Sequence, residues 1–165
     1  TEMRTLYEIC LTTASLVGYT VARKPKSLIR SKVMADETTF GLSAIEQIAV
    51  NAHDIERAVG FYRDKLGMKL LFSVPPNLAF FDCDGIRLML SLPAKPEFDH
   101  PSSVLYFNVD DIQQATQTLS ARGVQFEEQP EFVADMVTYD LWLAAFRDSE
   151  NNLLALMSHV PKKAS

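Results

Sequence analysis

Apolar residues change their spacing along the chain after residue 44, and each change marks an expected element. The run 45–51, IEQIAVN, alternates and is rich in β-formers, which predicts a strand. Residues 54–67 repeat apolar side chains at helical spacing, with Asp54 as the N-cap and Gly67 as the C-terminal stop. Three more strands are expected at 68–74, 77–83 and 86–92, the last two joined by an Asp-Gly hairpin turn. The predicted order is β-α-β-β-β.

The same order of elements recurs in the second half of the chain. A strand is expected at 103–109 and a helix at 110–123, ending at Gly123. The remaining strands are expected at 124–126, 138–146 and 152–158, with a loop around 130–132 between the first two.

The two halves can be laid over each other. Asn51 and Asp54 correspond to Asn108 and Asp111, a shift of 57 positions in both cases. Near the end of each half, Asp82 corresponds to Asp148 and Met89 to Ala155, a shift of 66 positions. A series of matches in the same order indicates a duplicated structural unit.

Three stretches, 45–68, 102–124 and 146–157, resemble the vicinal oxygen chelate superfamily. It includes glyoxalase I, bleomycin-resistance proteins, fosfomycin-resistance enzymes and extradiol dioxygenases. The last stretch, FRDSENNLLALM, is similar to the family pattern F-x-D-P-x-G-N-x-x-E-L, with Ser149 in place of Pro and Asn151 in place of Gly. The resemblance implies an α+β fold, in which two tandem β-α-β-β-β modules form half-barrels around a cleft.

The expected domain is glyoxalase-like and covers 44–160, with modules 44–97 and 102–158, followed by a tail at 161–165. Residues 1–43 are expected to be an extension outside the core. Within it, residues 1–33 hold six basic and two acidic residues, a net charge of +4, so the rest carries −9 of the total of −5. Two interpretations stay open for residues 1–33: an appended segment, or an additional helix that docks on the domain or on a partner.

Composition narrows the classes of partner. A net charge of −5 argues against nucleic acid, because phosphate binding requires a basic face. The apolar run 9–21 is shorter than the roughly 20 residues of a membrane-spanning helix, so no membrane association is expected. Two cysteines, Cys10 and Cys83, form no disulfide framework, which favours a reducing, cytoplasmic location.

Strand alternation separates a helix-facing side of each strand from a cleft-facing side. The cleft is predicted to bind a small-molecule ligand. Its expected residues are Gln47, Asn51, Arg87, Met89, Val104, Tyr106, Trp142, Leu153, Ala155 and Met157.

The resemblance also assigns four metal-ligand positions, one on the first and one on the last strand of each module. Here they are Gln47, Met89, Val104 and Ala155, where metal-using relatives typically have His, Glu or Gln. Val104 and Ala155 have no donor atom, and Met89 offers a thioether that suits soft ions only. The sequence therefore predicts neither a metal nor another cofactor at these positions.

Other chemistry has weaker support. No two of His53, His100 and His159 have metal-ligand spacing, and Cys83 beside a turn is expected to be an inert thiol. Tyr139 and Asp140 could form an acid–base pair with His53 or Glu127, although ordinary polarity at a strand edge is the simpler interpretation.

These observations favour a binding protein of the bleomycin-resistance type, which holds or sequesters an apolar or aromatic ligand, with Arg87 available for an anionic group. The alternative is a lyase, isomerase or dioxygenase of the same superfamily, with a relocated metal or with acid–base catalysis by Tyr106, Arg87 or Asp140. A third possibility is a structural role with a collapsed cleft. A homodimer is expected, because half-barrels often complete one another across chains.

Overall fold

The computed structural model describes Leu42 and residues 44–162. The chain divides into two units, 1–44 and 45–165, and the fold described below is that of the second. The expected extension at 1–43, except Leu42, and residues 163–165 of the expected tail lie outside the described residues. No helix in the described part of the chain is long and apolar enough to cross a membrane.

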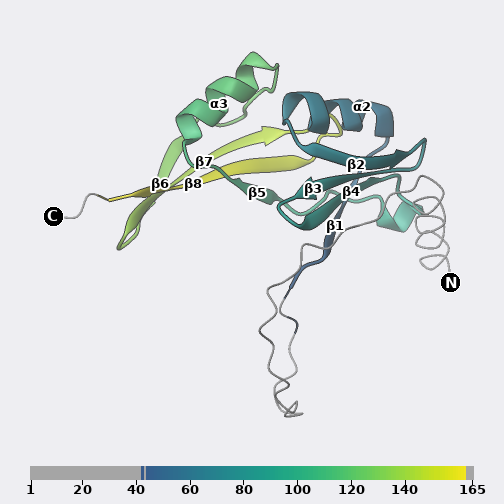
Figure 1. The fold of residues 1–165 in the computed structure, drawn as a ribbon, viewed down its shortest axis with the longest axis horizontal. Coiled ribbons are helices and arrows are strands. Elements are labelled where there is room, and N and C mark those ends of the chain that lie inside the picture. The colour runs from purple at the N-terminus through teal and green to yellow at the C-terminus, as the bar shows by residue number, and fades with distance from the viewer. Residues whose placement is uncertain (1–41, 43, 163–165) are drawn as a thin grey trace, which may run out of the picture. The chain divides into compact units, whose positions relative to one another are not determined.

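The first module has the expected β-α-β-β-β order (Figure 1). Its sheet has the strand order β1-β4-β3-β2, with β1 parallel to β4 and the other pairs antiparallel. Its elements are β1 (Gln47–Asn51), α2 (Ile55–Gly60), the π-helical turn η2 (Phe61–Lys65), β2 (Lys69–Val74), β3 (Leu78–Cys83) and β4 (Ile86–Ser91).

Local sequence signals explain the limits of this helix. The Asp54 carboxylate accepts a hydrogen bond from the Arg57 backbone N–H at 2.9 Å and caps the start of α2. Gly67 has a φ of 72°, a left-handed conformation that ends the helical segment at little cost for glycine.

The second module repeats the topology, with the strand order β5-β8-β7-β6 and β5 parallel to β8. The short 3-10 helix η3 (Pro96–Phe98) lies in the connection between the modules. The elements of the second module are β5 (Leu105–Asn108), α3 (Ile112–Ala121), β6 (Glu131–Asp135), β7 (Tyr139–Arg147) and β8 (Leu153–Pro161). Two four-stranded sheets with few helices confirm the predicted α+β class.

One predicted strand is wrong. Residues 124–126 form only an isolated bridge from Phe126 to Phe146, and the strand that pairs with β7 is β6, where a loop was expected. The backbone N–H groups of Glu127 and Glu128 both donate to the carbonyl of Ala145, at 2.8 and 3.2 Å. Because two successive donors share one acceptor, the ladder stops there and resumes only at Glu131.

A single apolar core runs through both modules. Val50 and Leu90 from the first sheet and Leu154 and Leu156 from the second belong to the same buried cluster, on the helix-facing side of each sheet. The helices contribute Ile55, Ala58 and Ile112. Strand alternation therefore predicted this face correctly, and it leaves the opposite face of each sheet for a cleft.

A buried polar network joins the modules at the turn before β8. The Asp148 carboxylate accepts hydrogen bonds from the backbone N–H of Asn152 at 2.8 Å and from the Tyr62 hydroxyl at 2.8 Å, and Tyr62 is 0% exposed. The Asn152 side chain donates to the carbonyl of Asn51 at 2.9 Å. This network links the end of β1 to the start of β8 and thereby fixes the strands that carry the predicted cleft residues.

The same turn has the conformation that the resemblance implies. Asn151, where the family pattern has glycine, has a φ of 69°. Asparagine is among the few residues other than glycine that adopt this left-handed region readily. The substitution of Gly by Asn therefore preserves the turn.

Candidate functional site

The cleft-facing side of the first sheet brings three predicted residues together. In the parallel pairing of β1 with β4, Gln47 lies opposite Arg87 and Ala49 lies opposite Met89. The Gln47 side-chain amide donates to the Met89 sulfur over 3.6 Å. All three predicted side chains are half-buried. Gln47 and Met89, two of the four positions assigned to metal ligands in relatives, are thus in direct contact.

The second sheet carries a small pocket of about 190 Å³ on the corresponding side. Tyr106 pairs with Ala155 across β5 and β8, and both line this pocket. Tyr106 is 53% exposed, whereas Ala155 is 4% exposed and forms part of the floor. The other lining residues are Val104, Glu127, Glu128, Leu143, Ala144, Ala145 and Leu153, all from the second module.

Asn51 and Met157 make contacts with the backbone and do not line the pocket. The Asn51 amide donates to the carbonyls of Phe98, at 2.6 Å, and of His100, at 3.0 Å, and so holds the connection between the modules against the end of β1. Met157 lies two residues beyond Ala155 on β8, opposite Leu143, but it does not line the pocket. Its carbonyl accepts from the Val109 N–H at 2.9 Å.

Trp142 does not belong to the cleft face, contrary to the prediction. It pairs with Ser158, whereas Leu143 and Ala145 pair with Met157 and Ala155, so the Trp142 side chain lies on the opposite side of β7. There it packs against the core cluster and makes an edge contact with Phe132 at a centroid distance of 5.9 Å. The indole fills the core because it lies on the same face as the buried Ala144.

The donor chemistry of the four family positions does not fit a divalent metal ion. The Val104 and Ala155 side chains are hydrocarbon, and the Gln47 amide and the Met89 thioether are both neutral. Zinc and harder ions are held by several imidazole, thiolate or carboxylate donors. Among the described residues, no group of three or more His, Cys, Asp and Glu side chains is placed to hold a metal ion.

The alternative catalytic groups are not brought together. His53 contacts Asp99 at 2.8 Å, whereas Glu127 forms an ion pair with Arg147 at 2.5 Å. Tyr139 packs edge-on against His159 with ring centroids 4.6 Å apart. Asp140 lies 3.7 Å from the Lys162 ammonium. Tyr139 and Asp140 therefore have different partners from those of the proposed acid–base pair.

Cys83 has the properties of an inert thiol. Burial, followed by the charges of Asp82 and Asp84, raises the pKa of its thiol above the ordinary value. A thiol with a raised pKa is protonated at neutral pH and is a weak nucleophile.

Glu128 is a pocket residue that the sequence analysis missed, and Glu127 was assigned there to a different site. The alternation of side-chain directions around Phe126 is the sequence signal for the position of Glu127. Because Phe126 packs against Phe146 on the helix-facing side, with ring centroids 5.3 Å apart, Glu127 points to the other side. The cleft face of the second sheet thus has an apolar floor with carboxylates at its rim.

Comparisons with known proteins identify this arrangement. Residues 44–156 match the model of the Glyoxalase/Bleomycin resistance protein/Dioxygenase superfamily. The chain belongs to this superfamily. No curated protein matches the chain significantly.

Solved structures show the same fold at low sequence identity. A lactoylglutathione lyase from Agrobacterium tumefaciens is 23% identical, with a TM-score of 0.59 over 71% of this chain and 94% of its own. A glyoxalase/bleomycin resistance protein/dioxygenase from Nocardioides is 23% identical, with a TM-score of 0.59 over 77% of this chain and 93% of its own. A glyoxalase-related enzyme from Fulvimarina pelagi is 17% identical, with a TM-score of 0.58 over 75% of this chain and 100% of its own.

Proposed function

We propose that this chain is a small-molecule-binding protein of the glyoxalase/bleomycin-resistance type that holds its ligand without a metal ion. The observation that carries the proposal is the hydrocarbon floor of the pocket on the second sheet. Val104 and Ala155, at two positions where metal-using relatives have ligands, line that pocket together with Leu143 and Leu153. Such a floor favours an apolar or aromatic body over a chelated ion.

Two polar features suggest how the ligand is oriented. The exposed Tyr106 offers an aromatic face and a hydroxyl at the rim of the pocket. Arg87 lies on the cleft side of the first sheet, and its guanidinium makes no hydrogen bond or ion pair within the described part of the chain. A guanidinium of this kind can hold a carboxylate or phosphate through two parallel hydrogen bonds. We expect an aromatic ligand whose single anionic group lies at Arg87, because the carboxylates of Glu127 and Glu128 at the rim of the second-sheet pocket repel an anion.

The size of the pocket favours a site shared by two chains. About 190 Å³ is below the roughly 300–1,000 Å³ of small-molecule sites, and the pocket is lined by the second module alone. A second copy that places the cleft side of its first sheet over this pocket would enlarge it and supply Gln47, Met89 and Arg87. We therefore propose a homodimer in which each cleft combines the first module of one chain with the second module of the other.

Metal content is the first measurement. The purified full chain is incubated with a mixture of Mn²⁺, Fe²⁺, Ni²⁺ and Zn²⁺, desalted and examined by elemental mass spectrometry beside an untreated sample. Metal at background level in both samples is the expected result. Near-stoichiometric retention would overturn the proposal and favour an enzyme with a relocated metal site.

Binding of 2-naphthoate, followed by calorimetry with and without EDTA, tests the ligand class. We expect binding that EDTA does not change and that Arg87→Gln and Tyr106→Ala each weaken severalfold. Lys95→Gln, an exposed basic position outside both sheets, serves as the matched control for the loss of a positive charge. Equal affinity for 2-naphthoate and for uncharged naphthalene-2-methanol would contradict the role of Arg87.

A further inference from the structure

A second and larger cavity lies on the opposite side of the second sheet. It has a volume of about 490 Å³, within the roughly 300–1,000 Å³ of small-molecule sites. Phe107 and Leu156 line it, and they alternate along β5 and β8 with Tyr106 and Ala155, which line the cleft-side pocket. The two cavities are therefore separated by the thickness of the sheet.

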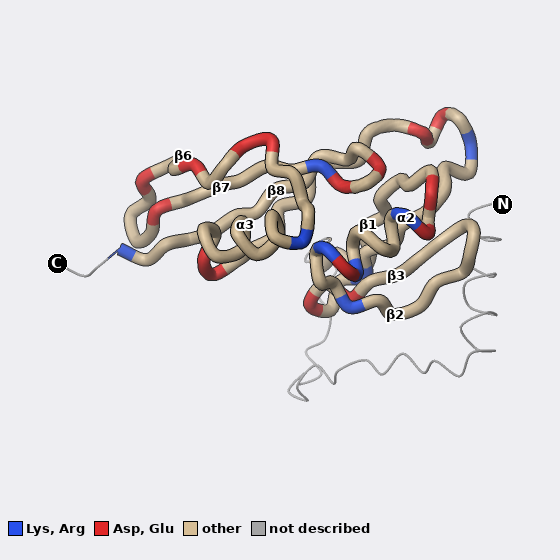
Figure 2. The backbone as a smooth tube through the Cα atoms, turned by 90° about the horizontal axis from the view of Figure 1, so that it is seen from above, with Lys and Arg blue, Asp and Glu red and all other residues tan. Residues whose placement is uncertain are grey.

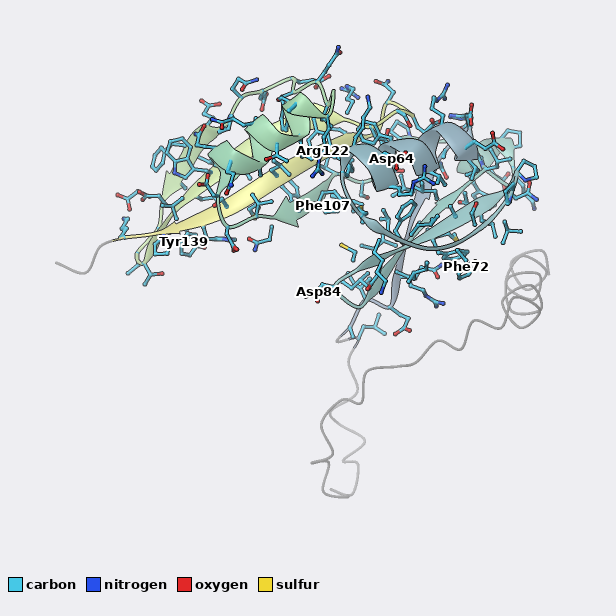
Figure 3. All side chains as sticks on the ribbon, turned by 45° about the horizontal axis from the view of Figure 1, so that its top comes forward. Asp64, Phe72, Asp84, Phe107, Arg122 and Tyr139 are labelled. Carbon is cyan, nitrogen blue, oxygen red and sulfur yellow. The ribbon has the colours of Figure 1, made fainter. Side chains whose placement is uncertain are left out.

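The cavity lies beneath α3, at the junction of the modules. The first module closes one side with Leu66 and Met68, which follow η2. Figure 3 shows Phe107 on β5 and Arg122 beyond the end of α3, both near this junction. The Arg122 guanidinium donates to the carbonyl of Lys65 at 3.2 Å and fixes the end of α3 against the first module.

Most of the cavity lining is apolar, although Asn108, Gln114 and Thr118 add polar side chains to it. Phe146 and Leu156 are buried at its base, and Leu119 and Ala115 of α3 form a wall. A hydrocarbon segment placed here leaves water at little cost, because most of the surface that it meets is also hydrocarbon.

Among the cavity-lining residues is a carboxylate with no partner in the described part of the chain. Asp111 lines the cavity but caps α3, since its side chain accepts from the Gln114 N–H at 2.9 Å. Asp110 also lines the cavity and is exposed, and its carboxylate has no hydrogen bond or ion pair to any other described residue. Its backbone carbonyl accepts from the Ser158 hydroxyl at 3.2 Å, which fixes the turn.

The surrounding charge is negative. Residues 102–161 contain nine Asp and Glu but only two basic residues, Arg122 and Arg147, whereas residues 45–101 contain eight acidic and six basic residues (Figure 2). None of the described cations in this region forms an ion pair with Asp110. The Arg122 guanidinium donates to the backbone carbonyl of Lys65, and the Lys65 ammonium donates to the backbone carbonyl of Gly123 at 3.0 Å. Arg147 pairs with Glu127, which lines the pocket on the cleft side. A ligand therefore meets a largely apolar wall and the Asp110 carboxylate, which forms no ion pair with any other described residue.

We propose that this cavity is a second ligand site, which binds a small amphipathic cation. The hydrocarbon part lies between Phe107 and Leu119, and the ammonium head lies at the Asp110 end. The occupant is an amine or quaternary ammonium compound, chemically opposite to the anionic aromatic ligand proposed for the cleft. The site is independent of the proposed function, because it uses different residues on the other side of the sheet.

Three probes of similar length test the site: hexyltrimethylammonium, 1-hexanol and hexanoate, titrated separately into the full chain and followed by methyl NMR. We expect shifts at Leu66, Leu119 and Leu156, with Leu153 on the cleft side unaffected. The cation should bind about three- to fivefold more tightly than the alcohol at low salt, and hexanoate more weakly than both. The preference for the cation should decline as salt is added.

Three variants distinguish the contribution of the Asp110 charge from that of the cavity volume. Asp110→Asn should remove the preference for the cation and leave the affinity for 1-hexanol unchanged, whereas Glu131→Gln, an exposed acidic position on β6, should change neither. Ala115→Phe should abolish binding of all three probes by filling the cavity. If Ala115→Phe does not fold, the methyl NMR shifts of the unmodified chain show whether the probes bind in this cavity. Shifts confined to Leu153 and Val104, or a cation preference that survives Asp110→Asn, would overturn the proposal.

The same titration distinguishes this site from the cleft. Tyr106→Ala should leave binding of hexyltrimethylammonium unchanged while it weakens binding of 2-naphthoate. Loss of both ligands in Tyr106→Ala would indicate one shared site and would overturn the second-site proposal.

Discussion

The Tyr62 hydroxyl makes a buried hydrogen bond across the junction of the modules. It is fully buried and donates to Asp148, whose carboxylate is also buried. Tyr62→Phe removes one donor to a buried charge, and hydrogen bonds to charged groups contribute about 1.5–3 kcal/mol. We expect a loss of about 2 kcal/mol in the free energy of unfolding by urea. Tyr139→Phe is the matched control, because its hydroxyl makes no hydrogen bond with any described residue, and it should cost less than about 0.5 kcal/mol.

Because the Tyr62 hydroxyl is buried, the folded chain should lose stability at alkaline pH. Burial first, and then the Asp148 charge, raise the pKa of Tyr62 far above its ordinary value. The unfolded chain therefore releases this proton near pH 10 while the folded chain retains it, so stability is complete below about pH 10 and falls as pH rises further. Urea unfolding between pH 8 and 11 should show this decline, and the decline should be smaller in Tyr62→Phe. An equal slope in both proteins would contradict the assignment.

A further prediction concerns Val104 and Ala155, two side chains that line the cleft-side pocket. The double variant Val104→His, Ala155→Glu places an imidazole and a carboxylate where the chain has only hydrocarbon. With the Gln47 amide of the facing module, these donors approach the ligand set of a zinc site. We expect the variant to retain Zn²⁺ after desalting and to gain thermal stability when Zn²⁺ is added. Each single variant should retain much less, and retention by the unmodified chain would contradict the mapping.

At the scale of elements, the turn before β8 is tied to the start of α2. The Glu150 side chain is 1% exposed and forms two hydrogen bonds with the Arg57 guanidinium, at 2.8 and 2.9 Å. It also accepts from the backbone N–H groups of His53 and Asp54, at 2.8 and 3.1 Å. The turn therefore completes the N-terminal cap of a helix in the other module.

Glu150→Gln should loosen this attachment. Burial alone would raise the pKa of Glu150, but the hydrogen bonds from Arg57, His53 and Asp54 outweigh burial and hold the pKa below its ordinary value. A lowered pKa contributes stability that is present above about pH 4.3 and is lost as pH falls through the folded-state value. We expect a loss of about 1–2 kcal/mol in unfolding free energy at pH 7. The difference from the unmodified chain should shrink below about pH 4.

Elements with a clear repeat could be predicted from the sequence, whereas those that depend on tertiary contacts could not. The helix from Ile55 and the strand from Tyr139 follow directly from periodicity and caps. By contrast, β6 has three exposed residues in a row at its start, and only its pairing with β7 makes it a strand. The π-helical turn at Phe61–Lys65 likewise has no sequence signal of its own, since its apolar spacing fits an α-helix.

The candidate site shows the same division at the scale of the whole molecule. Alternation put Gln47 and Met89 on one side of the first sheet, where β1 and β4 pair in a regular register and the two side chains are in contact. Val104, one residue before β5, lines the same pocket as Ala155. It could not place Trp142, since a large aromatic side chain suits a core and a ligand pocket equally well. The link from Tyr62 to Asp148 joins residues 86 positions apart, and no local pattern encodes such a contact.

The proposed dimer can be tested by mixing two variants that each bind 2-naphthoate weakly. If each cleft combines Arg87 of one chain with Tyr106 of the other, Arg87→Gln and Tyr106→Ala damage opposite halves of the same site. Unfolding and refolding an equal mixture should yield heterodimers in which one cleft carries both substitutions and the other carries none. About a quarter of all clefts should then bind 2-naphthoate with the original affinity.

Clefts built within one chain give a different result, because every cleft in the mixture then carries one of the two substitutions. The affinity for 2-naphthoate would then remain as low after refolding as in the two separate variants. Sedimentation of the unmodified chain supplies the control. A mass of one chain at the concentration of the binding assay would exclude shared clefts, and the pocket on the second sheet would then have to accommodate the ligand alone.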